Sequence, residues 1–323
     1  MNEQEILKLF LELTVDLDDL QFAIENRPLL AHYTSIDVLE KIMKTGELWF
    51  SNPLFMNDLE EVRFGVQQGA RLFWQNQLVV DACGSPNRSQ ILAHAFSHYY
   101  NQFDQEHAFD TYVFCLSQHE PTNTDGRLSM WRGYGGQGNG AALVFNTNFV
   151  TESKETSPLI LTRVHYASAE KRIEWLNTKL TRWCEIFKNA SIPDNQLHVA
   201  AYALFYTIKF FALKSKHDGF KEECEWRIIY MPEHDRHGTF SGKIRQHYLI
   251  GKRGVEPKLV FKIEPLYPDQ TWTFFDILDR IILGPSLSSW LARRSVERML
   301  EAVNKPEFRQ KASASQIPLR PSN

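Results

Sequence analysis

A chain of 323 residues, 43% hydrophobic and 23% charged, has the composition of an ordinary globular protein and can build one large domain or two smaller ones. The net charge of −3 gives no overall electrostatic reason to expect a nucleic-acid partner. The four cysteines include no CxxC pair, which argues against a metal site and favours reduced thiols in a cytoplasmic protein. No run of 18 apolar residues and no signal peptide is found, so we expect no membrane association.

The first half of the chain is predicted to consist mainly of helices, with two short strands between them. Apolar residues at helical spacing predict a lead-in helix, and Gly46 is expected to end a later helix. Asp58 can cap the helix that follows the second strand. The predicted elements are helix 4–24, strand 29–33, helix 36–44, strand 47–51, helix 58–77 and helix 88–106.

The second half mixes strands and helices without strict alternation. Its predicted elements are strand 111–117, helix 128–134, strands 141–146 and 161–167, helices 168–189 and 195–215, strand 224–232, hairpin 248–263, strand 280–284 and helix 288–303. This mixture predicts an α+β fold with a small, mostly antiparallel, split sheet flanked by helices. Because no long linker divides the chain, we expect a single domain over 1–323, with its core at 29–320 and a helical insertion at about 168–215.

The stretch KEECEWRIIY contains the first candidate for chemistry. Strand alternation places Glu225 and Arg227 on one face and Trp226, Ile228 and Tyr230 on the other. Charged residues are mostly exposed, so the simple interpretation is a solvated face. The alternative is that Glu225 is a carboxylate at a strand end that faces a cleft.

A second candidate lies in SMWRGYGGQGNG. Trp131 is the better candidate for core packing, whereas Tyr134 stands beside a glycine loop that leaves its ring less enclosed. The loop lacks the lysine and hydroxyl of a phosphate-binding loop. In FMNDLEEVRFG, residues 55–65, the acidic side chains suit a helix start better than a metal site, because no histidine lies at a useful spacing.

The only basic concentration in the chain lies at 233–254. Such a run is usually a solvated surface, but it can also contact a nucleic acid or a phosphate. Its basic residues and histidines are His234, Arg236, His237, Lys243, Arg245, His247, Lys252 and Arg253.

Three segments together resemble the ADP-ribosyltransferase fold of the His-Tyr-Glu type. HYTSIDVLEKIMKTGEL, at 32–48, is similar to that family's first motif, which has a histidine, any residue and a hydroxyl residue before a helix and a glycine. MWRGYGGQGNGAALVF, at 130–145, places a tyrosine on a short helix ahead of a strand, as the second motif does. ECEWRIIY, at 223–230, carries a glutamate into a strand, as the third does.

The chain also resembles a bacterial family of unknown function, the one numbered 2971. The marks of that family are HYTS, FMND-x-E, MW-x-x-Y, GF-x-x-E-x-EWR and IP-x-R. They stand here at 32–35, 55–60, 130–134, 219–227 and 317–320. This resemblance implies a family and no activity.

The ADP-ribosyltransferase resemblance implies NAD as substrate, and either transfer of ADP-ribose to a protein or nucleic-acid acceptor or hydrolysis of NAD. Glu225 would be the catalytic carboxylate that stabilises the cation-like ribose. Tyr134 would stack on the nicotinamide, and His32 would hydrogen-bond a ribose hydroxyl. The further expected NAD contacts are Tyr33, Thr34 and Trp131. We therefore expect His32, Tyr134 and Glu225 to line one concave site.

Several alternatives stay open at this point. Glu222 and Glu223 compete with Glu225, Tyr33 or Tyr100 could take the place of Tyr134, and His32 could be a hydrogen-bonded core residue. The protein could also be a non-catalytic nucleotide-binding or interaction module, or a nucleic-acid-processing enzyme that uses the basic run. The resemblances further imply a cytoplasmic bacterial effector of phage defence or of a toxin system.

Overall fold

The computed structural model describes residues 1–17, 19–56, 59–103, 110–150, 159–231, 235, 240, 242–251, 254–265 and 270–319. The chain divides into two compact units. Unit 1 comprises Met1–Asp19, Asn52–Tyr112 and Val164–Lys221, and unit 2 comprises Leu20–Ser51, Val113–Arg163 and Glu222–Asn323. The prediction of one domain stays a prediction, because two compact units can still fold as one cooperative domain.

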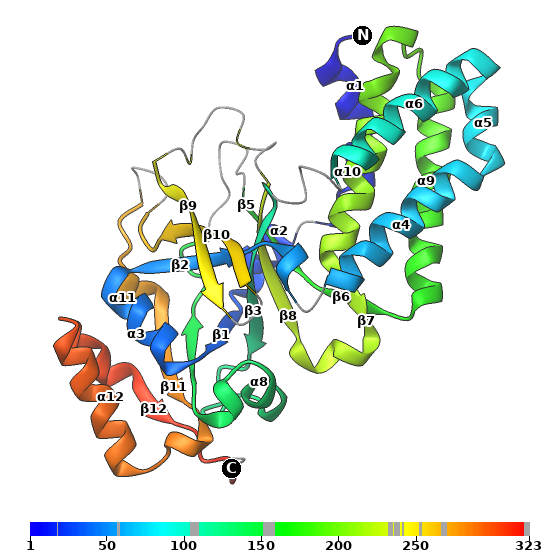
Figure 1. Cartoon of the computed structure of the whole chain (residues 1–323). Helices are drawn as coiled ribbons and strands as arrows, with labels where there is room; N and C mark the ends of the chain where they lie inside the picture. Colours follow the sequence, from blue (N-terminus) through cyan, green and yellow to red (C-terminus); the bar gives the residue numbers. More distant parts are fainter. Residues whose placement is uncertain are drawn as a thin grey trace. The chain divides into compact units, whose positions relative to one another are not determined.

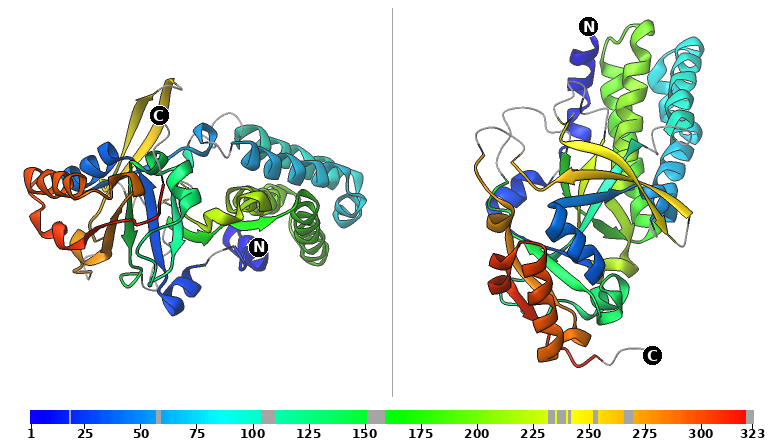
Figure 2. Two further views of the ribbon diagram at one scale, coloured as in Figure 1. Left: turned by 90° about the horizontal axis from the view of Figure 1, so that it is seen from below. Right: turned by 60° about the vertical axis from the view of Figure 1, so that its left-hand side comes forward.

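Unit 1 is built almost entirely of helices. Figures 1 and 2 show α4, α6, α9 and α10 running side by side. The helices are α1 (Glu3–Leu9), α4 (Leu59–Gln75), α5 (Gln77–Cys83), α6 (Pro86–Gln102), α9 (Ala169–Asn189) and α10 (Leu197–Lys214). Two short parallel strands, β6 (His165–Ala167) and β7 (Ser215–His217), complete the unit.

Close packing against α10 depends on two glycines of α4. A Cβ atom at Gly65 would overlap Ala212, and one at Gly69 would overlap Ile208, so only glycine lets the two helices approach this closely. The segment Asp194–Lys214 is long and apolar enough to cross a membrane, but 78% of its most apolar window is buried. Such burial is what a core helix shows.

The expected continuous helix over 4–24 is wrong. It is replaced by α1, a short 3-10 turn and α2 (Leu20–Asn26). The reason is the buried ammonium of Lys214, which donates hydrogen bonds to the backbone carbonyls of Asp16 and Leu17 and to the Asp19 carboxylate, at 2.9 to 3.0 Å. A helix through these residues would use the same carbonyls for its own hydrogen bonds.

Unit 2 contains a sheet that, among the described residues, has ten strands. The order is β12-β11-β4-β1-β3-β2-β10-β9, and β8 lies between β3 and β5 off this path. The strands are β1 (Leu29–Thr34), β2 (Glu47–Ser51), β3 (Tyr112–His119), β4 (Ala141–Phe145), β5 (Leu159–Arg163), β8 (Glu225–Tyr230), β9 (Ile244–Gly251), β10 (Gly254–Lys262), β11 (Leu278–Leu283) and β12 (Ala312–Ala314). In this sheet the β11–β12 pair is parallel, and the β1–β4 and β5–β8 pairs are among those that run antiparallel. The sheet is therefore mostly antiparallel, which confirms that part of the predicted α+β fold.

Short helices accompany this sheet in unit 2. They are α2, α3 (Ile36–Thr45), α8 (Leu128–Gly133), α11 (Phe274–Ile277) and α12 (Trp290–Ala302). The β1-α3-β2 segment agrees with its prediction, and Gly46 ends α3 in the left-handed conformation with φ 65°. The strand predicted at 161–167 is instead divided between β5 and β6. Asp58, the predicted cap of α4, lies outside the described residues.

Candidate functional site

The two faces of β1 lead to different surroundings. Leu30 pairs with Phe145 of β4, and both line an apolar pocket, the β1-pocket. Ala31 and Tyr33 point the opposite way, into a core cluster that contains Trp131. Because strand side chains alternate, His32 lies on the face of Leu30. We call these two sides of the sheet the pocket face and the α8 face.

His32 is half-buried on the pocket face. Its ring stacks on Phe114, which lines the β1-pocket, with ring centroids 4.5 Å apart. Its Nδ1–H donates a hydrogen bond to the Cys115 carbonyl at 3.0 Å. Burial lowers the pKa of His32, and this hydrogen bond offsets part of the effect. Burial therefore favours the neutral imidazole, and the hydrogen bond fixes the orientation of its ring.

Tyr33 and Trp131 both lie in the core on the α8 face. The Tyr33 hydroxyl accepts a hydrogen bond from the Arg127 backbone N–H at 2.9 Å, and burial raises the pKa of Tyr33. The Trp131 side chain is fully buried, and its indole N–H donates to the Asp125 carbonyl at 2.8 Å. Both side chains have satisfied polar atoms, which favours packing over contact with NAD. Thr34, on the pocket face, is also buried.

Glu225 and Arg227 form a buried ion pair at the start of β8. Two hydrogen bonds join the guanidinium to the carboxylate, at 2.8 and 3.0 Å, and the residues are 1% (Arg227) and 6% (Glu225) exposed. The expectation of a solvated face is therefore wrong, because the pair compensates the two charges and allows both to be buried. Ile228 of the same strand lines the β1-pocket, so alternation puts Glu225 and Arg227 on the α8 face.

Tyr134 meets a different glutamate from the one expected. Its hydroxyl donates a hydrogen bond of 2.8 Å to the Glu223 carboxylate, across 89 residues of sequence. Tyr134 is 41% exposed, and Glu223 is half-buried. Next to Tyr134, a Cβ atom at Gly133 or Gly136 would meet no atom of the described chain within 4 Å. The backbone on either side of Tyr134 therefore borders free space at these two glycines.

The backbone between the two glutamates is strained. Cys224 has φ 43°, in the left-handed region that residues other than glycine rarely adopt. Two hydrogen bonds from β3 hold it there: Ser117 Oγ donates to the Glu223 carbonyl at 2.6 Å, and the Gln118 N–H donates to the Cys224 carbonyl at 2.8 Å. Such strain clusters at functional sites, because it fixes side chains in positions that regular backbone would not give.

The structure does not assemble the expected three-residue site. Glu225 lies on the α8 face and His32 on the pocket face, and Tyr134 contacts Glu223. What the structure does bring together at one place is Tyr134, Glu223 and the strained Cys224. Ser117, which secures Glu223, was missed by sequence reasoning, and its only signal was its place in the strand 111–117.

The basic run at 233–254 gives little support to a nucleic-acid interface. Among the described residues, Arg245 pairs with Glu47 at 3.0 Å and Lys243 donates to the Pro265 carbonyl at 3.3 Å. His247 packs edge-on against Trp49. The remaining basic members, His234, Arg236, His237, Lys252 and Arg253, lie outside the described residues.

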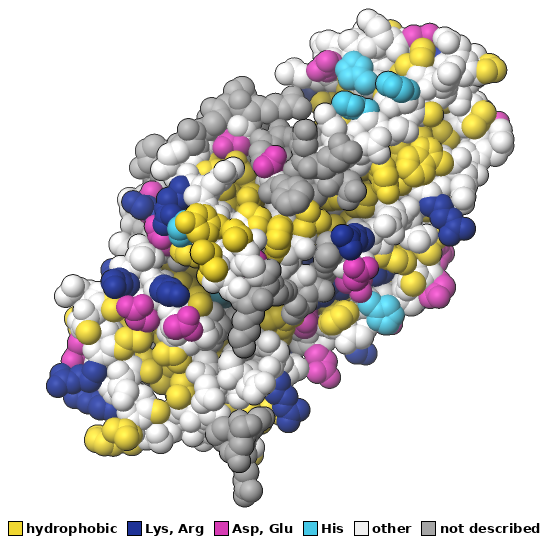
Figure 3. All heavy atoms as spheres, viewed as in Figure 1, with side chains coloured by type: hydrophobic (Ala, Val, Ile, Leu, Met, Phe, Trp, Pro, Cys, Tyr) yellow, Lys and Arg dark blue, Asp and Glu magenta, His cyan; other side chains and the backbone are white. Residues whose placement is uncertain are grey.

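Unit 1 contributes a histidine-lined hollow that the sequence did not suggest. Figure 3 shows histidines gathered at one end of the helical unit, and His94, His98 and His198 line a hollow with Tyr99 and Asp194. No group of three or more potential ligands within the described ranges is arranged to hold a metal.

Comparison with known proteins gives one family match. Residues 130–228 match the model of a family described as Protein of unknown function (DUF2971). The match includes Tyr134, Glu223 and Glu225 and ends before the basic run. It supports the resemblance to DUF2971 inferred from the motifs at 130–134 and 219–227. No curated protein and no solved structure matches the chain, so the ADP-ribosyltransferase resemblance stays a prediction.

Proposed function

We propose that unit 2 binds NAD beside the Tyr134–Glu223 pair and cleaves its nicotinamide–ribose bond, as an ADP-ribosyltransferase-like enzyme or an NAD hydrolase. The observation that carries the proposal is the hydrogen bond between the exposed Tyr134 and the carboxylate of Glu223, which precedes the strained Cys224. In this proposal Glu223, rather than Glu225, is the carboxylate that meets the ribose.

The chemistry needs two kinds of group at one place. When the bond breaks, nicotinamide leaves with the bonding electron pair and the ribose becomes cation-like. A carboxylate beside the ribose stabilises that charge and accepts a hydrogen bond from its hydroxyl. The acceptor hydroxyl, or water, then bonds to the ribose carbon and loses its proton. The exposed ring of Tyr134 offers a face for the nicotinamide.

Glu225 has a supporting part in this proposal. Its carboxylate is engaged by Arg227 and buried, so it is less suited to direct contact with a substrate. The ion pair fixes the start of β8, and Ser117 fixes the carbonyl of Glu223 two residues earlier. Both contacts position the Glu223 side chain.

The test is release of nicotinamide from labelled NAD by purified wild type, Glu223→Gln and Glu222→Gln. Glu223→Gln keeps the size of the side chain and removes its charge, so turnover should fall by about 10²–10³-fold. Glu222 is exposed in the same turn, and Glu222→Gln should keep wild-type turnover. Thermal melts of the three proteins control for folding.

A further variant separates this site from the one expected from the motifs. His32→Gln should leave nicotinamide release unchanged, because His32 lies on the pocket face. Loss of turnover in His32→Gln with normal turnover in Glu223→Gln would contradict the proposed site. Absence of nicotinamide release by wild type with any acceptor would contradict the enzyme proposal.

A second candidate function is a non-catalytic nucleotide-binding or interaction module. It is favoured by the separation of His32 and Glu225 on opposite faces of the sheet and by the closed Glu225–Arg227 pair. Isothermal titration with NAD distinguishes the two, because a module binds NAD without releasing nicotinamide.

A further inference from the structure

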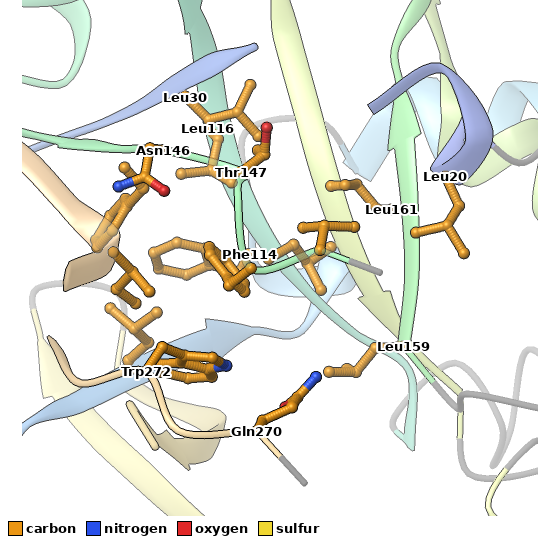
Figure 4. A pocket seen from close by; sticks show the side chains of 16 residues that line it. Leu20, Leu30, Phe114, Leu116, Asn146, Thr147, Leu159, Leu161, Gln270 and Trp272 are labelled. Carbon is orange, nitrogen blue, oxygen red and sulfur yellow. The ribbon is translucent and has the colours of Figure 1, made fainter. Parts of the chain in front are cut away.

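The β1-pocket is an apolar cavity of about 200 Å³ within unit 2. Six strands contribute apolar side chains to its wall, all from the pocket face: Leu30, Leu48, Phe114, Phe145, Leu161 and Ile228. Figure 4 shows these walls, with the indole of Trp272 lying across one side. A dry engineered cavity of roughly 150 Å³ binds benzene, so this pocket has room for a slightly larger molecule.

The polarity of the wall limits what such a molecule can be. None of the described residues that line the pocket is charged. Two of its polar side chains are already engaged, since Thr147 donates to the Pro28 carbonyl at 2.9 Å and Asn146 donates to the Asp276 carbonyl at 2.7 Å. A charged ligand would lose its hydration without gaining a counter-charge. The occupant is therefore neutral.

Trp272 adds a specific polar requirement. Its indole Nε1–H is buried and finds no hydrogen-bond acceptor among the described residues. Its ring is held by Phe149, with centroids 5.2 Å apart. A buried donor without a partner destabilises a protein, which makes such a group a natural partner for an acceptor atom on a ligand.

We propose that the β1-pocket binds a small neutral aromatic or aliphatic molecule that carries one hydrogen-bond acceptor, such as a carbonyl oxygen, directed at Trp272 Nε1. Hydrophobic burial supplies the affinity, and the hydrogen bond selects for the acceptor. The site is separate from the Tyr134–Glu223 pair and independent of the activity proposed for it.

Two probes of nearly equal shape test both parts of the proposal. Acetophenone has one acceptor and no donor, and isopropylbenzene has the same number of heavy atoms and no acceptor. We expect saturable binding of both to the full chain, measured by ligand-observed NMR titration. Acetophenone should bind about two- to tenfold more tightly, the range expected of one net hydrogen bond.

Two substitutions locate the binding. Leu161→Trp fills the pocket and should weaken acetophenone binding about tenfold or more, because the new ring occupies the ligand's space. Trp272→Phe keeps an aromatic ring and removes the donor, so acetophenone should lose its advantage and bind no more tightly than isopropylbenzene. The matched control is Leu291→Trp, at a residue of α12 that is 68% exposed, which should bind like wild type.

Folding is checked by thermal melts, and Ile228→Phe replaces Leu161→Trp if that variant does not fold. No saturable binding to wild type would overturn the proposal. Unchanged affinity in a folded pocket-filling variant would also overturn it, because the probes would then bind elsewhere. If Trp272→Phe lowers the affinity for both probes by the same factor, the proposed hydrogen bond is refuted and the site is purely apolar.

Discussion

The two faces of the sheet in unit 2 differ in whether their buried polar groups have partners. On the α8 face, the Glu225 carboxylate is paired with Arg227, and the Tyr33 hydroxyl and the Trp131 indole have backbone partners. On the pocket face, the walls are apolar and the Trp272 donor has no partner in the described chain. A face with satisfied polar groups specifies the fold. A face with a cavity, and with a donor that has no acceptor among the described residues, has the features expected of a ligand site.

The largest expected effect comes from breaking the ion pair of the α8 face. Arg227→Met keeps an apolar stem but leaves the Glu225 carboxylate buried without its guanidinium. The free energy of unfolding should fall by about 3–5 kcal/mol. The measurement is urea unfolding followed by circular dichroism.

A double variant provides the control for this pair. Glu225→Leu combined with Arg227→Met replaces both charges with apolar groups and should recover most of the lost stability. If Arg227→Met alone is as stable as wild type, the α8 face does not depend on charge compensation, and the contrast between the faces disappears.

A pH titration compares one histidine from each face. Burial lowers the pKa of His32 on the pocket face and of His119 on β3. Their ordinary pKa is 6.5, so the unfolded chain takes up protons first as the pH falls below that value. Stability from both groups is thus present above pH 6.5 and lost as the pH falls toward their lowered pKa values.

Substitutions of His32 and His119 measure how much each residue contributes to the stability lost at low pH. His32→Phe preserves the ring stack on Phe114 and should reduce the stability lost between pH 7.5 and 5.5, measured by urea unfolding. His119→Phe should reduce it as well. Replacement of an exposed histidine, His94→Gln, should leave the loss as in wild type. An identical pH dependence in all four proteins would refute the assignment.

A smaller effect is expected from the hydroxyl of Tyr134. Tyr134→Phe keeps the ring and removes one hydrogen bond to Glu223, so the carboxylate is held less well. Nicotinamide release should fall by about two- to tenfold, consistent with the loss of a single hydrogen bond. Tyr99→Phe, at a tyrosine of unit 1, is the control and should have wild-type turnover. A loss as large as that of Glu223→Gln would show that the hydroxyl itself takes part in the chemistry.

The smallest expected effect concerns backbone strain. Glycine adopts the left-handed conformation of Cys224 without steric cost, so Cys224→Gly should raise the free energy of unfolding by about 1 kcal/mol or less, and with it the melting temperature slightly. Cys224→Val should lower it, since a β-branched residue suits a positive φ poorly. Equal melting temperatures for all three proteins would mean that the strain is negligible.

Local elements were predictable because their signals are local. The β1-α3-β2 segment follows from a strand pattern, a helical stripe and Gly46, and the structure reproduces its boundaries to within one residue or two. Alternation within β8 correctly separated Glu225 and Arg227 from Ile228. Such patterns state which neighbours share a face, and they need no knowledge of the rest of the chain.

The arrangement of the site was not predictable in the same way. Whether His32 and Glu225 share a face depends on β3, which lies between β1 and β8 and sets the register of both. The Tyr134–Glu223 contact joins residues 89 positions apart. Burial of Glu225 was missed because composition predicts exposure for a lone charge, whereas Arg227 supplies the compensating charge.

The division of each unit into three separate chain segments has a consequence for synthesis on the ribosome. Unit 1 has all its segments once Lys221 has emerged, whereas the sheet of unit 2 is incomplete until β12, at Ala312–Ala314, is made. β1 is paired once β3 and β4 have emerged, but β2 must wait for most of its pairing until β10, about 200 residues downstream, is made. Exposed strand edges of this kind favour aggregation. Expression at low temperature, or with chaperones that shield nascent strands, should raise the soluble yield of this protein.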